Sequence, residues 1–185
     1  PWYAGETVIA GIGQGYMLVT PLQLAHATAT VAMQGQRIRP RLLHAAQIPG
    51  TGVAVTELAQ TLPAVEYVDL LGWRYVIHAM TEVVHGSRGT ARRIGRGLDY
   101  RIAGKTGTAQ VFSLAEDEEY DAESLARELR DHSLFVAFAP VEDPRIALAV
   151  IAEHGGSGSA VAAPIARQIL DAYLEDGAHA PQPAQ

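Results

Sequence analysis

The chain has 185 residues, of which 48% are hydrophobic, so it is long enough to bury a core, and this length favours one domain. Its formal net charge of −6 argues against a nucleic-acid partner, because binding a phosphate backbone requires a positive surface. Cysteine is absent, which excludes disulfides and thiolate metal sites.

The chain begins Pro1-Trp2-Tyr3, without an initiator methionine or a signal peptide, and it has no apolar run long enough to span a membrane. We therefore expect it to be part of a longer protein. Residues 1–175 are expected to belong to one domain. Residues 176–185, rich in Ala, Pro and Gln, are expected to be a disordered tail.

The first predicted helix follows a glycine-rich loop at 11–15. Residues 20–23, Thr-Pro-Leu-Gln, have the pattern of a capping box with proline at the first helical position. A helix is expected from there to about Met33, ended by Gly35. Residues 36–47 are expected to be extended, before a turn at 49–52.

A second helix is predicted from near Val68 to Gly86. Its apolar residues recur at alternating spacings of three and four, which indicates one amphipathic face. The members of this face are Leu70, Trp73, Ile77, Met80 and Val84.

Residues 98–111 predict a strand with Lys105 in its middle, because they mix β-branched residues with small ones and glycine. A polar loop at 113–120 and a short helix starting at Asp121 are predicted next. Within that helix Glu123 and Arg127 are spaced to pair.

The last third of the chain predicts a β-hairpin and a helix. Two apolar runs, 133–139 and 145–151, are separated by a proline-rich turn. After a flexible turn at 155–158, a helix is expected over 159–175, with one apolar face made of Val161, Ile165, Ile169 and Tyr173. This order predicts an α/β fold in which the last three strands form an antiparallel sheet against the C-terminal helix.

Several common motifs are absent. The Gly-Lys-Thr at 104–106 is not a phosphate loop, because Asp99 stands where that loop needs glycine. The glycines at 11–15 lack the spacing of a dinucleotide fingerprint and predict a structural turn. Ser157 lacks the second glycine of a nucleophile elbow. The acidic cluster 116–119 is predicted to be a solvated loop, and we predict no metal and no cofactor.

Lys105 is the only lysine among the fourteen Lys and Arg residues. It is either a survivor of codon bias or serves chemistry that the planar, permanently charged arginine cannot supply. The sequence Lys105-Thr106-Gly107-Thr108 favours chemistry, because K-T-G is one of three motifs of class A β-lactamases and penicillin-binding proteins. A lysine cation and threonine hydroxyls can hold a carboxylate, and Gly107 lets a ligand lie close to the strand.

Strand alternation raises a difficulty for this site. It puts Lys105 and Thr106 on opposite faces of the strand. Both can serve one site only if this is an edge strand whose rim lines a cleft and whose backbone N–H groups are free.

Five segments extend the similarity over nearly the whole chain: 1–7, 11–16, 20–23, 105–112 and 130–140. In this order they resemble the penicillin-binding protein 2 family, the elongation-type class B D,D-transpeptidases of Gram-negative bacteria. The resemblance implies the C-terminal portion of the penicillin-binding protein and serine β-lactamase-like transpeptidase fold. It also implies that the Lys105 strand lies at the edge of the sheet.

The resemblance also implies a reaction. In that family a serine of an S-x-x-K motif attacks the penultimate D-Ala carbonyl of a stem peptide, releases the terminal D-Ala and passes the acyl group to the amine of a neighbouring peptide. β-Lactams acylate the same serine. Lys105 would supply positive potential and a hydrogen bond toward the serine of an S-x-N motif. Thr106 and Thr108, with Gly107 between them, would bind the substrate carboxylate, and the Thr108 N–H would be half of the oxyanion hole.

The chain itself contains neither of the other two motifs. Ile102 stands three residues before the only lysine, which excludes S-x-x-K, and asparagine is absent, which excludes S-x-N. We therefore expect the nucleophile to lie upstream in a parent protein and this fragment alone to be inactive. Without the strands that precede that serine, an apolar sheet edge is expected to be exposed unless another chain covers it.

The resemblance implies stem peptides and β-lactams as ligands. The expected protein partners are the missing N-terminal part of the same domain and, through the parent, membrane proteins of the elongation machinery. The implied location is the periplasmic face of the bacterial inner membrane. Two alternatives stay open: a non-catalytic binding or assembly module that uses residues 113–130, and a serine β-lactamase.

Overall fold

The structure, a computed structural model, describes residues 2–43, 45–47, 51, 54–56, 58–66, 70–110, 126, 128 and 130–175. Its elements in chain order are α1 (Ala4–Gly11), α2 (Pro21–Ala32), β1 (Arg37–Ile38), β2 (Ala45–Gln47), β3 (Ala54–Thr56), β4 (Thr61–Leu62), α3 (Leu70–His85), β5 (Ala103–Ala109), β6 (His132–Ala139), β7 (Ile146–Ala152) and α4 (Ala162–Glu175).

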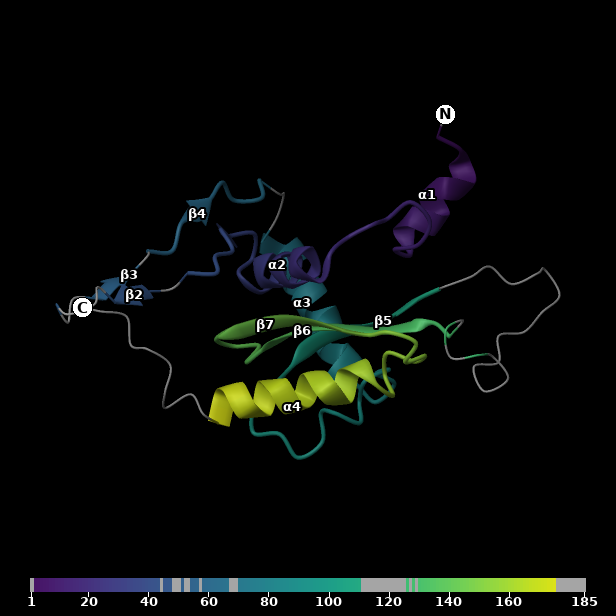
Figure 1. The fold of residues 1–185 in the computed structure, drawn as a ribbon. Coiled ribbons are helices and arrows are strands. Elements are labelled where there is room, and N and C mark those ends of the chain that lie inside the picture. Colours follow the sequence, from purple (N-terminus) through teal and green to yellow (C-terminus); the bar gives the residue numbers. More distant parts are fainter. Residues whose placement is uncertain are drawn as a thin grey trace.

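An antiparallel sheet of three strands in the order β5-β6-β7 forms the centre of the molecule (Figure 1). Residues 103–109 pair with 132–138, and residues 133–139 pair with 146–152. Among the described residues, β5 and β7 are therefore the two edges of this sheet. The predicted antiparallel sheet of the last three strands is confirmed, and so is the hairpin.

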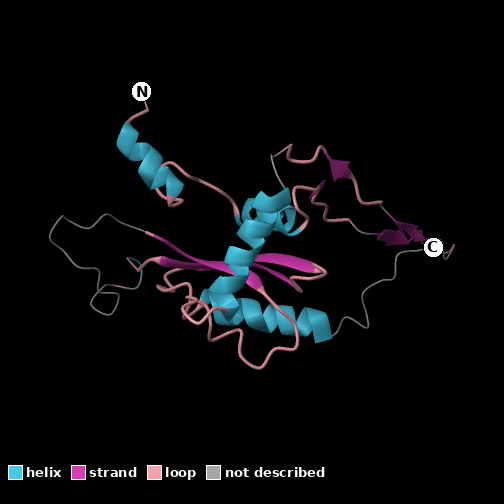
Figure 2. Cartoon of the chain, turned by 180° about the vertical axis from the view of Figure 1, so that it is seen from behind, coloured by secondary structure: helices cyan, strands magenta, loops and turns pink. Residues whose placement is uncertain are grey.

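Helices cover both faces of the sheet. α2 lies over one face and α4 over the other, and the view from behind shows α3 crossing the sheet (Figures 1 and 2). On the α4 face, Phe135 is buried against small helical residues such as Ala166. On the other face, Phe138 is buried with Ala32 and Ala103. Because both faces are covered, side chains that alternate along β6 are buried on either side.

The capping box predicted for α2 is present. The Thr20 hydroxyl accepts a hydrogen bond from the Gln23 N–H at 3.2 Å, and the Thr20 N–H donates to the Gln23 side chain at 2.7 Å. Pro21 occupies the first turn, where its missing N–H costs nothing. Gly35 follows the helix with a φ of +95°, which explains why glycine stands there.

The apolar face predicted for α3 is confirmed in its C-terminal half. Val84 is fully buried, and Ile77 and Met80 pack against the core. Leu70, in contrast, is 63% exposed.

The apolar face predicted for α4 is wrong. Ile165, Ile169 and Tyr173 are 40–45% exposed. The buried positions are Ala162, Ala163, Ala166 and Leu170. Three alanines let the helix backbone approach the sheet closely, and Leu170 is the one large side chain of this contact face. The helix also begins at Ala162, three residues later than predicted.

The sequence patterns did not predict α1, β3 or β4, whereas the extended stretch expected at 36–47 contains β1 and β2. α1 has no buried residue among those described, so it lacks the apolar periodicity that reveals a helix. β1 pairs with β4, and β2 pairs with β3, in two small sheets away from the central one. The glycine-rich loop at 11–15 is a turn, as predicted, with positive φ at Gly13 and Gly15.

Three predicted segments lie largely outside the described residues: the turn at 49–52, the polar loop with its following helix, and the tail at 176–185. Of the helices that the structure describes, none is both long and apolar enough to cross a membrane.

Candidate functional site

The open edge of β5 presents backbone hydrogen-bonding groups. The Thr108 carbonyl accepts from the Gln14 side chain at 3.1 Å, and the Thr106 carbonyl accepts from Lys105 Nζ at 2.6 Å, so neither carbonyl points at β6. The N–H and C=O of one strand residue point to the same side. The N–H groups of Thr106 and Thr108 therefore also face the open edge.

Lys105 is exposed and lines a cleft of about 450 Å³. One wall of the cleft is α3, which contributes Glu82, and the other is the loop of residues 86–90 that follows it. The loop brings Arg88 to the same cleft. Lys105 thus stands between a carboxylate and a guanidinium, in a cleft that suits a charged ligand.

Thr106 lies on the opposite face of β5 and meets the same loop. Its hydroxyl is 3.0 Å from that of Thr90, close enough for one to donate to the other. Thr90 also lines the cleft that contains Lys105. The loop therefore wraps around the strand edge, which resolves the alternation difficulty, because residues from both faces reach one rim.

Close backbone contacts support β5 from behind. A Cβ on Gly104 would lie 2.5 Å from Cζ of Phe135, and a Cβ on Gly158 would lie 2.5 Å from the Gly107 carbonyl oxygen. Gly104 thus packs under the Phe135 ring and Gly158 on the backbone of Gly107, and a side chain at either position would force a neighbour to shift. Gly107 itself faces Leu134, with room for close approach on its outer side.

His85 holds the beginning of β5. Its Nε2 accepts a hydrogen bond from the Ile102 N–H at 3.0 Å, which requires the neutral imidazole. Partial burial, and then the positive charge of Arg101, lower the pKa of His85, while Glu142 and Glu82 oppose this shift. The neutral form is therefore favoured, and α3 stays joined to the strand that carries Lys105.

A larger cavity of about 580 Å³ lies elsewhere and contains none of the predicted site residues. Its wall is a structural network in which the Tyr100 hydroxyl donates to Asp171 at 2.5 Å and Arg167 binds Asp171 at 2.6 Å. Burial and the bond to Asp171 raise the pKa of Tyr100. No cluster of potential metal ligands occurs among the residues that the structure describes.

Sequence reasoning missed four residues that surround β5: Gln14, Glu82, Arg88 and Thr90. Gln14 and the Thr108 that it contacts are 94 residues apart, so no local pattern links them. Thr90 lies in the loop after the predicted helix, where residue spacing does not predict which way a side chain points. These contacts depend on the path of the loop around the sheet edge.

Comparison with known proteins gives one consistent result. Residues 1–171 match the family described as the penicillin binding protein transpeptidase domain. The peptidoglycan D,D-transpeptidase MrdA of Haemophilus influenzae is 41% identical over 174 residues, which are 94% of this chain. The match is 26% of that protein, so the chain spans about a quarter of the curated relative's length.

Solved structures agree. Pseudomonas aeruginosa PBP2 in complex with WCK 5153 is similar at a TM-score of 0.74 and 47% identity, over 94% of this chain and 33% of that one. Helicobacter pylori PBP2 in its complex with MreC is similar at a TM-score of 0.73 and 27% identity, over 96% of this chain and 29% of that one.

Proposed function

The chain belongs to the penicillin-binding protein transpeptidase family, and from this premise we propose that it supplies the lysine-bearing strand of a peptidoglycan D,D-transpeptidase active site. The resemblance and the fold class predicted from the sequence are confirmed by the family match and by the solved relatives. The observation that carries the proposal is the open edge of β5, where Lys105 lines a cleft and backbone N–H groups are unpaired with β6.

We assign the site roles from this geometry. Lys105 supplies the positive charge that attracts the terminal carboxylate of a stem peptide or a β-lactam. The hydroxyls of Thr106 and Thr108 hold that carboxylate, and Gly107 leaves room for the ligand backbone. The outward N–H of Thr108 donates to the developing oxyanion, while the Gln14 side chain holds the carbonyl of the same residue.

In the parent protein the reaction would have two steps. A serine Oγ attacks the penultimate D-Ala carbonyl, an ester forms, and the terminal D-Ala leaves with a proton on its amine. The amine of a second peptide then attacks the ester, a peptide bond forms, and the serine regains its proton. The chain contributes charge and hydrogen bonds to both steps but no nucleophile, because it lacks S-x-x-K.

Labelling with a fluorescent penicillin tests the absence of a nucleophile. The 185-residue chain should not become covalently labelled, whereas the full-length parent should. Labelling of the isolated chain would contradict the proposed inactivity. The two proteins can be compared on one denaturing gel, since only a covalent adduct survives.

Substitution in the full-length parent tests the role of Lys105. Lys105→Ala should slow acylation by about 100-fold, the size expected when one electrostatic contact to the reacting group is lost. Arg145→Ala is the matched control, because Arg145 is an exposed cation at the start of β7 and lies outside the β5 cleft. Equal acylation rates for Lys105→Ala and the wild type would remove Lys105 from the site.

The proposed setting is the periplasmic face of the inner membrane, with the rest of the transpeptidase domain and elongation-machinery membrane proteins as partners. The complex of the Helicobacter pylori protein with MreC supports a second candidate, an assembly role. If residues 113–130 serve that role, their deletion should abolish capture of an elongation partner by the parent and leave penicillin labelling intact. Unchanged capture would remove this candidate. Rapid β-lactam turnover by the parent would instead favour a β-lactamase.

A further inference from the structure

The segment that joins α3 to β5 carries an unusual charge. Residues 87–101 contain five arginines and one aspartate, a formal charge of +4. The rest of the chain therefore has a formal charge of −10, because the net charge of the whole chain is −6. A concentration of one sign on an acidic chain either is a solvated face or has an oppositely charged partner.

The segment is held firmly against the body of the protein. Ala91 and Ile94 are buried, and the Ala91 N–H donates to the Val83 carbonyl at 2.9 Å. From α4, Arg167 donates to the carbonyls of Ile94 at 2.6 Å and Arg96 at 3.3 Å. Its apolar side chains point inward, so the arginines are displayed on a fixed backbone.

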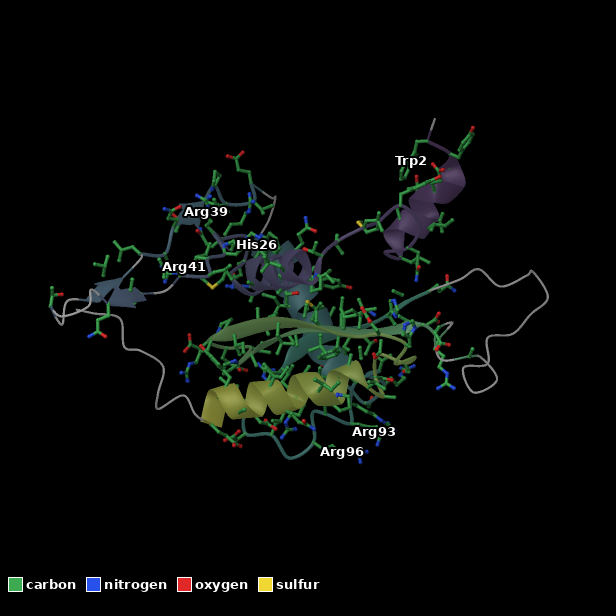
Figure 3. All side chains as sticks on the ribbon, viewed as in Figure 1. Trp2, His26, Arg39, Arg41, Arg93 and Arg96 are labelled. Atoms are coloured by element: carbon green, nitrogen blue, oxygen red, sulfur yellow. The ribbon has the colours of Figure 1, made fainter. Side chains whose placement is uncertain are left out.

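Two of the five arginines are engaged within the protein. Arg92 donates to the Ser87 carbonyl at 3.0 Å, and Arg101 is paired with Glu142. The guanidinium groups of Arg88, Arg93 and Arg96 have no hydrogen bond or ion pair to any residue that the structure describes. These three are called the arginine track below, and Figure 3 shows Arg93 and Arg96 side by side on the outer face of the segment.

One member of the arginine track lies at the candidate site. Arg88 lines the same cleft as Lys105, and the segment then leads to Arg93 and Arg96. Cations that start at the cleft and continue beyond it can bind a ligand longer than the reacting group. That ligand must carry several negative charges.

The track also lacks the features of a membrane anchor. Within residues 87–101 no large hydrophobic side chain is exposed. Binding to a lipid surface combines basic residues with apolar side chains that enter the bilayer. A hydrophilic polyanion fits this surface better.

We propose that the arginine track binds the carboxylates of cell-wall polymer, the stem peptides of the strand that delivers its reacting peptide to the cleft. Arginine binds carboxylates through two parallel N–H···O bonds, and its guanidinium is permanently charged. The proposal deepens the proposed function and rests on it for the identity of the polymer.

Binding of the 185-residue chain to soluble uncross-linked peptidoglycan fragments tests the proposal. The comparison ligand is the same material with its carboxyl groups converted to amides. Arg93→Glu with Arg96→Glu should weaken binding of the carboxylate form about tenfold. Raising the salt from about 50 to about 300 mM should weaken wild-type binding as well, because exposed charges are screened. The amidated fragments should bind weakly to every variant.

Arg39→Glu with Arg74→Glu is the matched control. Both are exposed arginines, the double change alters the net charge by the same amount, and Arg39 lies far from the track (Figure 3). This control should bind within about twofold of the wild type. Equal losses for the two double variants would mean that only net charge matters and would overturn the proposal.

Two further measurements separate the remaining outcomes. If vesicles containing phosphatidylglycerol compete fully for the track while the carboxylate fragments do not bind, the track is a membrane contact and the proposal is wrong. Penicillin labelling of the full-length parent should not depend on Arg93 or Arg96, because neither lines the Lys105 cleft. If labelling fails while the peptidoglycan fragments still bind, only the proposed function is refuted. If labelling succeeds while the fragments do not bind, only the proposed role of the arginine track is refuted.

Discussion

The central sheet and the N-terminal helix α1 differ in how they are held. In β6, side chains are buried on both faces, and Phe135 and Phe138 are completely covered. α1 has no buried residue, and its neighbours include Leu18, which is 90% exposed. The sheet therefore draws its stability from the described part of the chain, whereas α1 does not.

The difference suggests what α1 is for. Contiguous exposed apolar side chains mark an interaction surface. Trp2, Val8, Ile12 and Leu18 are exposed in the N-terminal segment, which Gln14 connects to the β5 edge. In the proposed function, the rest of the transpeptidase domain is the partner that covers them. α1 would then be ordered by the complete domain, while the sheet would fold around its own core.

The largest effect on stability is expected from a substitution in the core of the sheet. Phe135→Ala should lower the free energy of unfolding by about 3–5 kcal/mol, because it removes a fully buried ring and leaves a cavity. Leu18→Ala should change it by less than about 0.5 kcal/mol. Urea unfolding of the isolated chain measures both. Similar losses would show that α1 is packed in the chain by itself.

A smaller effect concerns the backbone behind the site. Gly158→Ala places a Cβ 2.5 Å from the Gly107 carbonyl oxygen, so the loop must shift, at a cost of about 1–3 kcal/mol. Gly72→Ala is the contrasting change, because nothing lies within 4 Å of the added Cβ and alanine favours the helix. It should stabilise the chain by about 0.5–1 kcal/mol. A stabilising Gly158→Ala would refute the close packing.

The smallest expected effect is a dependence on pH through His85. Its pKa is lower in the folded state than in the unfolded chain, so the unfolded state binds more protons as the pH falls. The stabilising contribution is therefore complete above about pH 6.5 and is lost as the pH falls from there through the folded pKa. His85→Gln keeps a hydrogen-bond acceptor but cannot titrate.

Thermal unfolding at several pH values checks this sign. The melting temperature of wild type relative to His85→Gln should fall as the pH is lowered from about 7.5 to about 5. The protection factor of the Ile102 amide, which is its exchange rate corrected for the intrinsic pH dependence, should fall over the same range in the wild type only, because a protonated imidazole cannot accept that N–H. A difference that is constant with pH would mean that His85 is not the titrating group.

Local patterns in the sequence determined several elements and the chemical character of the site. The Thr20 cap and the apolar spacing in α3 identified two helices, because such signals depend only on neighbours within one or two turns. The apolar runs around the 140–144 turn identified the hairpin. Lys105-Thr106-Gly107-Thr108 predicted the chemistry, because the only lysine stands beside two hydroxyls and a glycine.

Only the tertiary structure decided which surfaces meet. The contact face of α4 consists of three alanines and Leu170 and not of Ile165, Ile169 and Tyr173, because the helix turns these four residues toward the sheet. Lys105 and Thr106 reach one rim because the loop at 86–90 passes around the edge of β5. Both outcomes depend on contacts between residues far apart in the chain, which periodicity and motif spacing do not encode.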